Sequence, residues 1–458
     1  MVPQVGERGA LPQNSTRVFA CQGAGPQVGT ARGAGLSVLL VGARQVVTCR
    51  GPARARRGRE MAELEVLEDA VVWIADDGWV HAVGSYQSLA RPASGAGAQV
   101  VEVDGVLLPG FVDAHTHAVF GAPRLEDHER RARGVTYQEI AAAGGGILSS
   151  VREVRRKSAE ELRDLTARRL HHLLRHGTTT VEIKSGYGLT VEDELKQLDV
   201  IRSLRGRPPR LVATFLGAHE VPEEHRPDPE EYIRLLLDEM LPAVTRHGLA
   251  RFCDAFCEPG VFSVDQTRRV LEAARTYGLR LKLHADELDG SGGAELAVAL
   301  GAISADHLAA ISERGIAALA GSETVAVLLP GTMLFLGQRR QAPARRLIDA
   351  GAAVALATDF NPGSSPGMSL PLMAMLGVSQ MGMLPAEAIT AITVNGAAAV
   401  GAAASTGQIA PGFRADLVLL AVQDWREVPY WYGVNLVREA WVGGAACHLG
   451  KGTLDFAV

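Results

Sequence analysis

The sequence predicts an α/β fold: a closed (β/α)₈ barrel of the TIM type, accompanied by a small β-sandwich built from both chain ends. Three observations lead to this prediction. Between residues 105 and 404, apolar segments alternate with amphipathic segments of helical period. The apolar segments are nearly continuous, as in parallel strands that helices cover from outside. The segments on either side of this region are short, β-rich and separated by glycine turns.

The barrel is expected to contain eight strands, the first of them the apolar run 106–112, interrupted by Pro109 and Gly110. An open, doubly wound sheet is the alternative, but no expected strand is followed by a glycine-rich phosphate loop. Helices are expected at 159–177, 229–248 and 264–278, among others. The seven further strands are expected within 177–185, 210–219, 250–258, 279–287, 301–308, 324–331 and 352–363.

The two flanking segments, 36–104 and 405–458, are expected to form the two parts of one β-sandwich beside the barrel, which takes residues 105–404. Residues 1–35 are rich in Gly, Pro and Gln and contain no apolar stretch long enough for a signal peptide or a membrane helix. We expect them to be disordered or to result from a misplaced start codon.

The composition argues against several classes of function. The chain has 458 residues, 47% of them hydrophobic, and its formal net charge of −5 provides no basic surface for nucleic acid. The five cysteines are widely spaced, so we expect no disulfide framework, and Cys253 and Cys257 are expected to be buried thiols. We therefore expect a cytoplasmic homodimer that acts on a small molecule and has neither nucleic-acid nor membrane partners.

Two histidines, His115 and His117, follow the first apolar run. In an extended strand this spacing places both imidazoles on one face. Because all strands of a parallel barrel end at the same rim, His284 and Asp359, which end two later strand segments, should converge on the same place. Three neutral imidazoles and one carboxylate suit one Zn²⁺ or iron ion (Fe²⁺ or Fe³⁺) per subunit, with a position left for water.

A metal ion with an open position makes hydrolysis the natural class of reaction, because its bound water ionises near neutral pH. A general acid/base is also needed, and Glu287 lies three residues after His284. Strict alternation along a strand would turn Glu287 to the opposite face. The role therefore requires that the strand has ended and that the loop turns Glu287 inward.

Six segments carry a family resemblance: HTHAVFGAPR (115–124), KSGYGL (184–189), FLGAHE (215–220), HADE (284–287), SADH (304–307) and ATDFNPGSSP (357–366). Together they resemble the amidohydrolase superfamily in its mononuclear branch and, within it, the imidazolonepropionase family. The resemblance runs from about residue 36 to the end of the chain. It implies that water opens the ring of 4-imidazolone-5-propanoate to give N-formimidoyl-L-glutamate in histidine degradation.

The resemblance also implies roles for individual residues. Glu287 would be the acid/base, and His307 would stand near the substrate carbonyl as a polariser or second proton relay. Arg124 is at the position that binds the propanoate carboxylate, a group that a guanidinium fork suits. Asn361, Gly363 and Ser364 follow Asp359 in a loop whose amides and polar tips can hold substrate atoms. Tyr187 and His219 would hydrogen-bond the substrate.

Three alternatives remain open at this point. A nucleobase-type deaminase could use the same metal ligands and the same Glu287, although its uncharged substrate would give Arg124 no carboxylate to bind. A catalytically inactive barrel could serve as a binding subunit, but all four expected ligands are present. Lys184 raises the third alternative, because dinuclear members of the superfamily bridge two metals with a carboxylated lysine.

Overall fold

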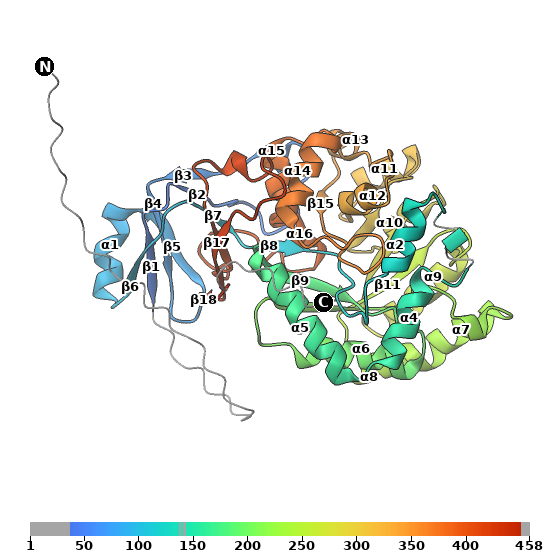
Figure 1. Ribbon diagram of the computed structural model, residues 1–458. Coiled ribbons are helices and arrows are strands. Elements are labelled where there is room, and N and C mark those ends of the chain that lie inside the picture. Colours follow the sequence, from blue (N-terminus) through green and yellow to red (C-terminus); the bar gives the residue numbers. More distant parts are fainter. Residues whose placement is uncertain (1–36, 137–138, 141–142, 450–458) are drawn as a thin grey trace, which may run out of the picture. The chain divides into compact units, whose positions relative to one another are not determined.

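Eight parallel strands form the barrel of the computed structural model, which describes residues 37–136, 139–140 and 143–449 (Figure 1). Each strand pairs with the next one along the chain. The first and last strands meet just beyond their ends, where the amide of Asp359 donates to the carbonyl of His115 and Thr116 bridges Phe360. The strands are β8 (Phe111–Asp113), β9 (Thr178–Lys184), β10 (Arg210–Ala218), β11 (Phe252–Cys257), β12 (Arg280–Ala285), β13 (Ser304–His307), β14 (Val325–Leu328) and β15 (Val354–Leu356).

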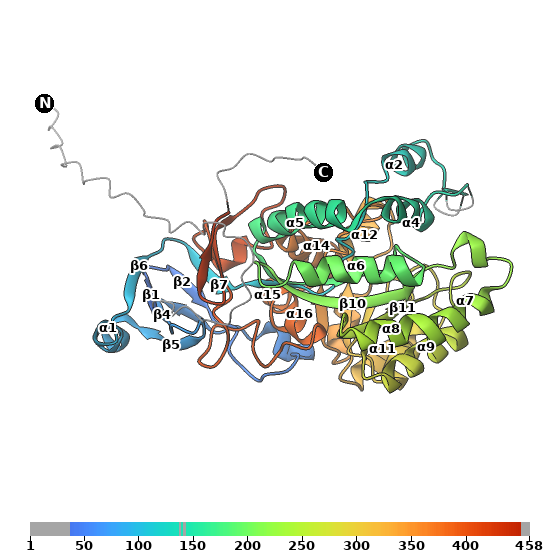
Figure 2. The same cartoon turned by 90° about the horizontal axis from the view of Figure 1, so that it is seen from below.

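Helices cover the outer side of these strands (Figures 1 and 2). Helix α5 (Ala159–Arg175) begins at a capping box, in which the Ser158 hydroxyl accepts from the Glu161 amide and the Glu161 carboxylate accepts from the Ser158 amide. The eight parallel strands and the helices that cover them confirm the predicted barrel. The other helices are α2 (Leu125–Ala132), α4 (Ile147–Arg156), α6 (Val191–Ser203), α7 (Pro229–Leu235), α8 (Leu241–Arg246), α9 (Val264–Thr276), α10 (Gly293–Ala299), α11 (Glu313–Ala320), α12 (Pro330–Phe335), α13 (Ala344–Asp349), α14 (Leu370–Met381), α15 (Pro385–Ile392) and α16 (Val394–Ala399).

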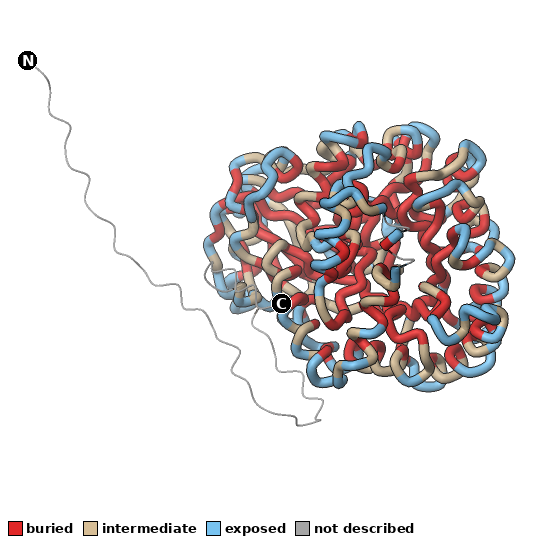
Figure 3. The backbone as a smooth tube through the Cα atoms, turned by 45° about the vertical axis from the view of Figure 1, so that its right-hand side comes forward, coloured by how far each residue is buried: buried red, intermediate tan, exposed pale blue. Residues whose placement is uncertain are grey.

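The core lies between the strands and their helices. Figure 3 shows buried positions concentrated in the interior and exposed positions on the outer turns. Every residue of β14 and of β15 is buried, which accounts for the purely apolar runs at these two strands in the sequence. Cys253 and Cys257 lie on β11 and are both buried, and burial raises the pKa of the Cys257 thiol to about 11.

Both chain ends contribute to a two-sheet sandwich, as predicted. One sheet orders β5, β4, β1 and β6, and the other orders β18, β17, β16, β7, β2 and β3. Apolar side chains of both sheets share one core, among them Leu40, Val72, Leu107 and Leu417. The strands are β1 (Val38–Val41), β2 (Gln45–Val47), β3 (Val66–Glu68), β4 (Ala70–Ile74), β5 (Val80–Ser85), β6 (Gln99–Glu102), β7 (Val106–Pro109), β16 (Leu417–Leu420), β17 (Val437–Val442) and β18 (Ala445–Cys447), with α1 (Tyr86–Gly95) between β5 and β6.

The apolar run 106–112 is not one barrel strand. Its first part, β7, pairs with β2 and β16 in the sandwich, whereas its second part, β8, pairs with β9 in the barrel. Gly110 separates the two strands. Periodicity alone did not reveal this division, because both strands are fully buried and therefore equally apolar.

The described residues all belong to one compact unit. The expected leader, 1–35, lies outside the described residues, and the domain boundaries at 104/105 and 404/405 stay predictions. Among the helices of the described part of the chain, none combines the length and the apolar character that crossing a membrane requires.

Candidate metal centre and active site

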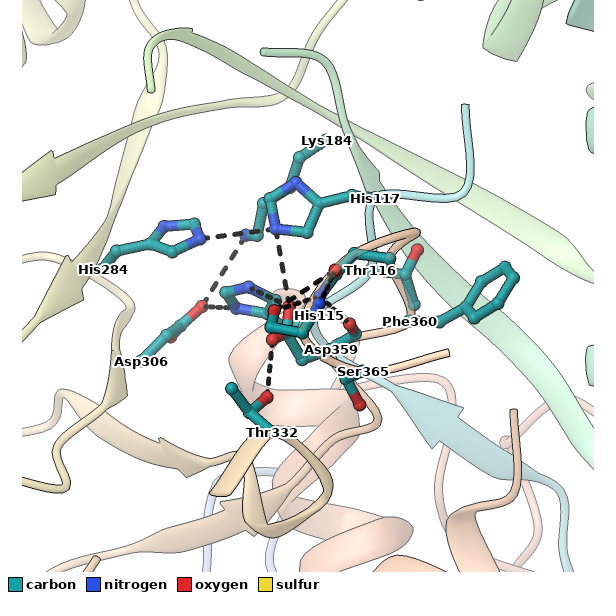
Figure 4. Close-up of polar contacts among 12 residues, drawn as sticks. His115, Thr116, His117, Lys184, His284, Asp306, Thr332, Asp359, Phe360 and Ser365 are labelled. Carbon is teal, nitrogen blue, oxygen red and sulfur yellow. Dashed lines mark hydrogen bonds and ion pairs between the residues drawn. The ribbon is translucent and has the colours of Figure 1, made fainter. Parts of the chain in front are cut away.

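The four predicted metal ligands meet where the barrel strands end (Figure 4). His115 and His117 follow β8, His284 lies in β12, and Asp359 lies three residues after β15. All four are at most 3% exposed. The Nε2 atoms of His117 and His284 are 3.4 Å apart. Oδ1 of Asp359 is 3.5 Å from Nε2 of His115 and 3.6 Å from Nε2 of His117.

These donor atoms fit a common metal ion. Ligand atoms about 2.1 Å from a tetrahedral ion lie about 3.4 Å from one another, close to the observed spacings. Nε2 of His115 is buried and has no hydrogen-bond partner among the described residues, as expected of an atom that faces a ligand. His307 and Asp359 also come close enough to His115 to form an overlapping triad.

The electrostatic surroundings favour the ligand forms of these side chains. Burial, together with the positive charge of Lys184, lowers the pKa of His115 well below its ordinary value. Burial also lowers the pKa of His117, with a contribution from His219. Both imidazoles are therefore neutral, which is the form that binds a metal.

Asp359 sits in a less polar environment than an ordinary aspartate. Burial raises its pKa to about 6, although a hydrogen bond from Oγ1 of Thr332 to Oδ2, 2.6 Å long, opposes this shift. The same hydrogen bond turns Oδ1 toward His115 and His117 (Figure 4).

Two further carboxylates lie beside the Nδ1 atoms of two imidazoles, on the side away from the expected metal. Oδ2 of Asp306 lies 2.6 Å from Nδ1 of His115, and Oδ2 of Asp254 lies 3.1 Å from Nδ1 of His284. A carboxylate accepts a proton here, so Nδ1 of His115 carries the hydrogen and Nε2 is left free as a ligand. Sequence reasoning missed both residues, although an aspartate inside the apolar strand β11 was a possible signal.

Glu287 reaches the site because strand β12 ends at Ala285. Asp286 takes a left-handed conformation (φ 51°), and its carboxylate accepts the amides of Gly292, Gly293 and Ala294. This turn brings Glu287 into the cavity. The strand has therefore ended before Glu287, and the loop turns the side chain inward, as the role of acid/base requires. Oε2 of Glu287 lies 3.5 Å from Nδ1 of His307, which ends β13. Burial and the negative charge of Asp359 raise the pKa of Glu287 well above its usual range.

A cavity of about 500 Å³ opens beside the ligands. Arg124 is only 9% exposed and donates from Nε to Oγ of Ser150 over 2.8 Å. The Arg124 guanidinium lies 5.8 Å from the centre of the Tyr187 ring. The His219 ring stacks on the His117 ring, with centroids 5.1 Å apart. All predicted site residues except His115 and Gly363 line this cavity: His117, Arg124, Tyr187, His219, His284, Glu287, His307, Asp359, Asn361 and Ser364.

The loop after Asp359 differs from the expected cradle of free amides. The amides of Gly363 and Ser364 both donate to Oδ1 of Asn361, each over 2.8 Å. These two N–H groups therefore hold the loop itself together. Gly363 instead makes room for Arg124, against which it is packed.

A buried carboxylate that sequence reasoning missed shapes the loop of Tyr187. Oε1 of Glu194, in helix α6, accepts the amides of Gly186, Gly188 and Leu189 at 2.8–3.1 Å. The carbonyl of Gly186 in turn lies 2.9 Å from Nδ1 of His219. Glu194 thereby fixes the backbone that carries two of the expected substrate contacts. Its signal in the sequence is slight, because one glutamate in a helix is usually exposed.

Comparisons with known proteins agree with this geometry. The model of the amidohydrolase family matches residues 106–445. The chain is 49% identical over 407 residues to the imidazolonepropionase of Geobacillus kaustophilus, with 88% of this chain and 96% of that protein covered. It is 46% identical over 407 residues to the imidazolonepropionase of Solibacter usitatus, with 88% and 97% covered.

More distant solved structures share the fold. E. coli guanine deaminase has a TM-score of 0.66 at 15% identity, with 90% of this chain and 99% of that chain covered. A zinc-containing adenosine deaminase from Xanthomonas campestris has a TM-score of 0.63 at 20% identity, with 90% and 92% covered. At such identities the likeness shows the fold alone. By its family match and its similarity to these relatives along nearly their whole length, the chain belongs to the amidohydrolase family and, within it, to the imidazolonepropionase group.

Proposed function

We propose that this protein is a metal-dependent hydrolase that opens the ring of 4-imidazolone-5-propanoate and releases N-formimidoyl-L-glutamate. The observation that carries the proposal is that one cavity is lined both by Glu287 with three of the four expected metal ligands and by the buried side chain of Arg124. A substrate that has a hydrolysable ring at one end and a carboxylate at the other matches such a cavity. The similarity to named imidazolonepropionases supports the same substrate.

The expected metal is one Zn²⁺ or iron ion, held by His115, His117, His284 and Asp359. When bound, such an ion supplies a nucleophile near neutral pH by acidifying water. Three imidazoles and a carboxylate accept either element, so the donor set does not select between them. Metal analysis of the purified protein by mass spectrometry tests this choice.

The protein's own residues move the protons. Water adds to the ring carbonyl carbon, the bond from that carbon to the ring nitrogen breaks, and a carboxylate forms. Glu287 accepts the proton that the water loses and delivers a proton to the departing nitrogen. A carboxyl group whose pKa lies above its usual range is suited to both steps. His307, 3.5 Å from Glu287, polarises the carbonyl oxygen.

The remaining residues orient the substrate. Arg124 binds the propanoate carboxylate, and the hydrogen bond from its Nε to Ser150 holds the side chain at the cavity wall. Tyr187 and His219 contact the ring. Asn361 and Ser364 close the side of the cavity next to Asp359.

The decisive experiment follows the ultraviolet absorbance of freshly generated 4-imidazolone-5-propanoate. Rapid loss of absorbance is expected with the wild-type protein, and not with a Glu287→Gln variant or a chelator-treated sample. The same samples are tested on a panel of nucleobases. Release of ammonia from a nucleobase, without any loss of imidazolone absorbance, would reject the proposal in favour of a deaminase.

We also propose that the protein works as a homodimer in the cytoplasm. Three neighbouring aromatic side chains, Tyr430, Trp431 and Tyr432, are 47–74% exposed, which is compatible with a subunit contact. Light scattering during size-exclusion chromatography measures the mass of the particle. A mass equal to that of one chain at micromolar concentration would reject the dimer.

A further inference from the structure

Beneath the expected metal ligands lies a cluster of five charged side chains linked by close contacts. Glu182 and Lys184 come from β9, Asp254 from β11, Lys282 from β12 and Asp306 from β13. Each of them has 0% side-chain exposure. Burying a charge is costly unless it is closely paired, so this cluster requires a specific explanation.

Lys184 is the residue that joins the cluster together. Its Nζ lies 2.8 Å from Oε1 of Glu182 and 2.8 Å from Oδ2 of Asp254. It also lies 3.6 Å from Oδ2 of Asp306, a contact that Figure 4 shows beside His115. Burial alone would lower the pKa of Lys184, but the charges of Asp254, Glu182 and Asp306 raise it, so the side chain remains an ammonium.

Two of these carboxylates are the ones that lie behind the imidazoles. Asp254 contacts Nδ1 of His284, and its Oδ1 also accepts the His284 backbone amide over 3.1 Å. Asp306 contacts Nδ1 of His115. One ammonium therefore touches both carboxylates that lie beside the Nδ1 atoms of two expected ligands.

The second buried lysine provides a contrast. Nζ of Lys282 lies 3.6 Å from Asp306, but its shortest contact is with the hydroxyl of Ser304, at 2.6 Å. No contact between Lys282 and Asp254 is found in the described part of the chain. Without Lys282, Asp306 would still have Lys184 as a cationic neighbour. Without Lys184, Asp254 would have no buried lysine or arginine paired with it among the described residues.

We propose that Lys184 is a positioning residue for the metal centre: its ammonium holds Asp254 and Asp306 so that the Nε2 atoms of His284 and His115 face one ion. The inference rests on the proposed function, because it presumes that the four ligands bind a metal.

The same contacts argue against a carboxylated Lys184 that bridges two metals. Carboxylation would replace the ammonium by an anion within hydrogen-bond distance of Glu182 and Asp254 and near Asp306. Three buried carboxylates would then face a fourth negative group, and Lys282 would be the one lysine left in the described cluster to offset them. The cluster thus favours a single metal ion, with the uncarboxylated ammonium of Lys184 beneath its ligands.

The test compares Lys184→Met with Lys282→Met as a matched control, since both remove one buried ammonium from the same cluster. Zn²⁺ affinity is measured by competition with a chromophoric chelator, and the visible spectrum of the Co²⁺-substituted protein reports ligand geometry. We expect Lys184→Met to lose about 10- to 100-fold in Zn²⁺ affinity, the usual effect of losing an outer-sphere partner. Its Co²⁺ absorption bands should shift, whereas Lys282→Met should change both quantities less.

A second variant keeps the test decisive if Lys184→Met fails to fold. Asp254→Asn leaves the shape of the side chain nearly unchanged and removes the charge that Lys184 holds. It should also weaken Zn²⁺ binding. If Lys184→Met does fold, the double variant should lose less affinity than the two single losses combined.

Three results would count against the inference. Equal Zn²⁺ affinity in the wild type and Lys184→Met would overturn it, even if activity were lost. Equal losses in Lys184→Met and Lys282→Met would show that any buried cation serves. A wild-type protein that binds no metal would overturn the proposed metal site as well. Metal binding by the wild type therefore distinguishes failure of the metal site from failure of the role of Lys184 alone.

Discussion

Gly363 is packed against Arg124 so closely that a Cβ atom at position 363 would lie 2.2 Å from Nη1 of the guanidinium. The backbone of Gly363 is not in the left-handed region, so the obstacle to a side chain there is the Arg124 guanidinium, which would have to move. The glycine therefore determines where the expected carboxylate-binding group can stand.

Gly363→Ala should displace Arg124 and weaken substrate binding. A charge-assisted hydrogen bond contributes about 1.5–3 kcal/mol, so KM should rise about 10- to 100-fold while kcat changes less. Gly367→Ala is the control, because a Cβ at that nearby position meets no atom within 4 Å. Steady-state kinetics of both variants check the prediction, which is wrong if the two KM values rise equally.

Glu287→Gln should reduce kcat by a factor of about 10² to 10⁴, the usual contribution of a general acid/base. Because Glu287 is not one of the four expected ligands, the metal content per chain should equal that of the wild type. Rate measurements are therefore paired with metal analysis of the same samples. Loss of metal together with loss of rate would assign Glu287 to the metal site instead.

Removing the metal should destabilise the fold. A ligand at about 1,000 times its Kd stabilises the folded state by about 4 kcal/mol, so a chelator should lower the melting temperature by several degrees. Asp359→Asn should melt at a lower temperature and respond much less to the chelator. An unchanged melting temperature in the chelated wild type would contradict a buried metal site.

Glu194→Gln should loosen the loop that carries Tyr187. An amide side chain offers one acceptor oxygen where the carboxylate offers two, and its NH₂ group would face backbone N–H groups. We expect kcat/KM to fall about 5- to 50-fold, because an unsatisfied buried donor costs about 1–3 kcal/mol. Glu192→Gln, an exposed change in the same helix, is the control. Equal kinetics of the two variants would refute the positioning role.

Gly110→Ala should destabilise the junction between β7 and β8. A Cβ there would lie 2.2 Å from Oγ1 and 2.3 Å from Cγ2 of Thr179, and overpacking of this kind costs about 1–3 kcal/mol. Gly95→Ala, where a Cβ meets nothing within 4 Å, should leave stability nearly unchanged. Urea denaturation followed by circular dichroism measures both. A Gly110→Ala protein as stable as the Gly95→Ala protein would show that Thr179 can move aside.

The convergence of the four expected ligands could be predicted from the sequence because parallel strands of a barrel end at one rim. His115, His284 and Asp359 lie far apart along the chain, yet each follows or ends an apolar segment. From the sequence, the inward direction of the Glu287 side chain could be stated only as a requirement for its role. It depends on Asp286, whose carboxylate binds amides several residues further along the chain.

The buried charges could not be predicted in the same way. Lys184 and Asp306 look like ordinary polar residues near strand ends, and their burial makes sense only once the partners on other strands are known. The division of residues 106–112 was hidden for a related reason. Two buried strands that belong to different sheets have the same apolar pattern.

Strand β7 has consequences for how the chain is made. Its neighbours in the sheet are β2, which is already synthesised, and β16, which leaves the ribosome about 310 residues later. Until then the nascent chain carries an apolar strand with an open edge, which can pair with other chains. Completion of this sheet therefore waits for nearly the whole protein, and translation that stops inside the barrel leaves a product prone to aggregate.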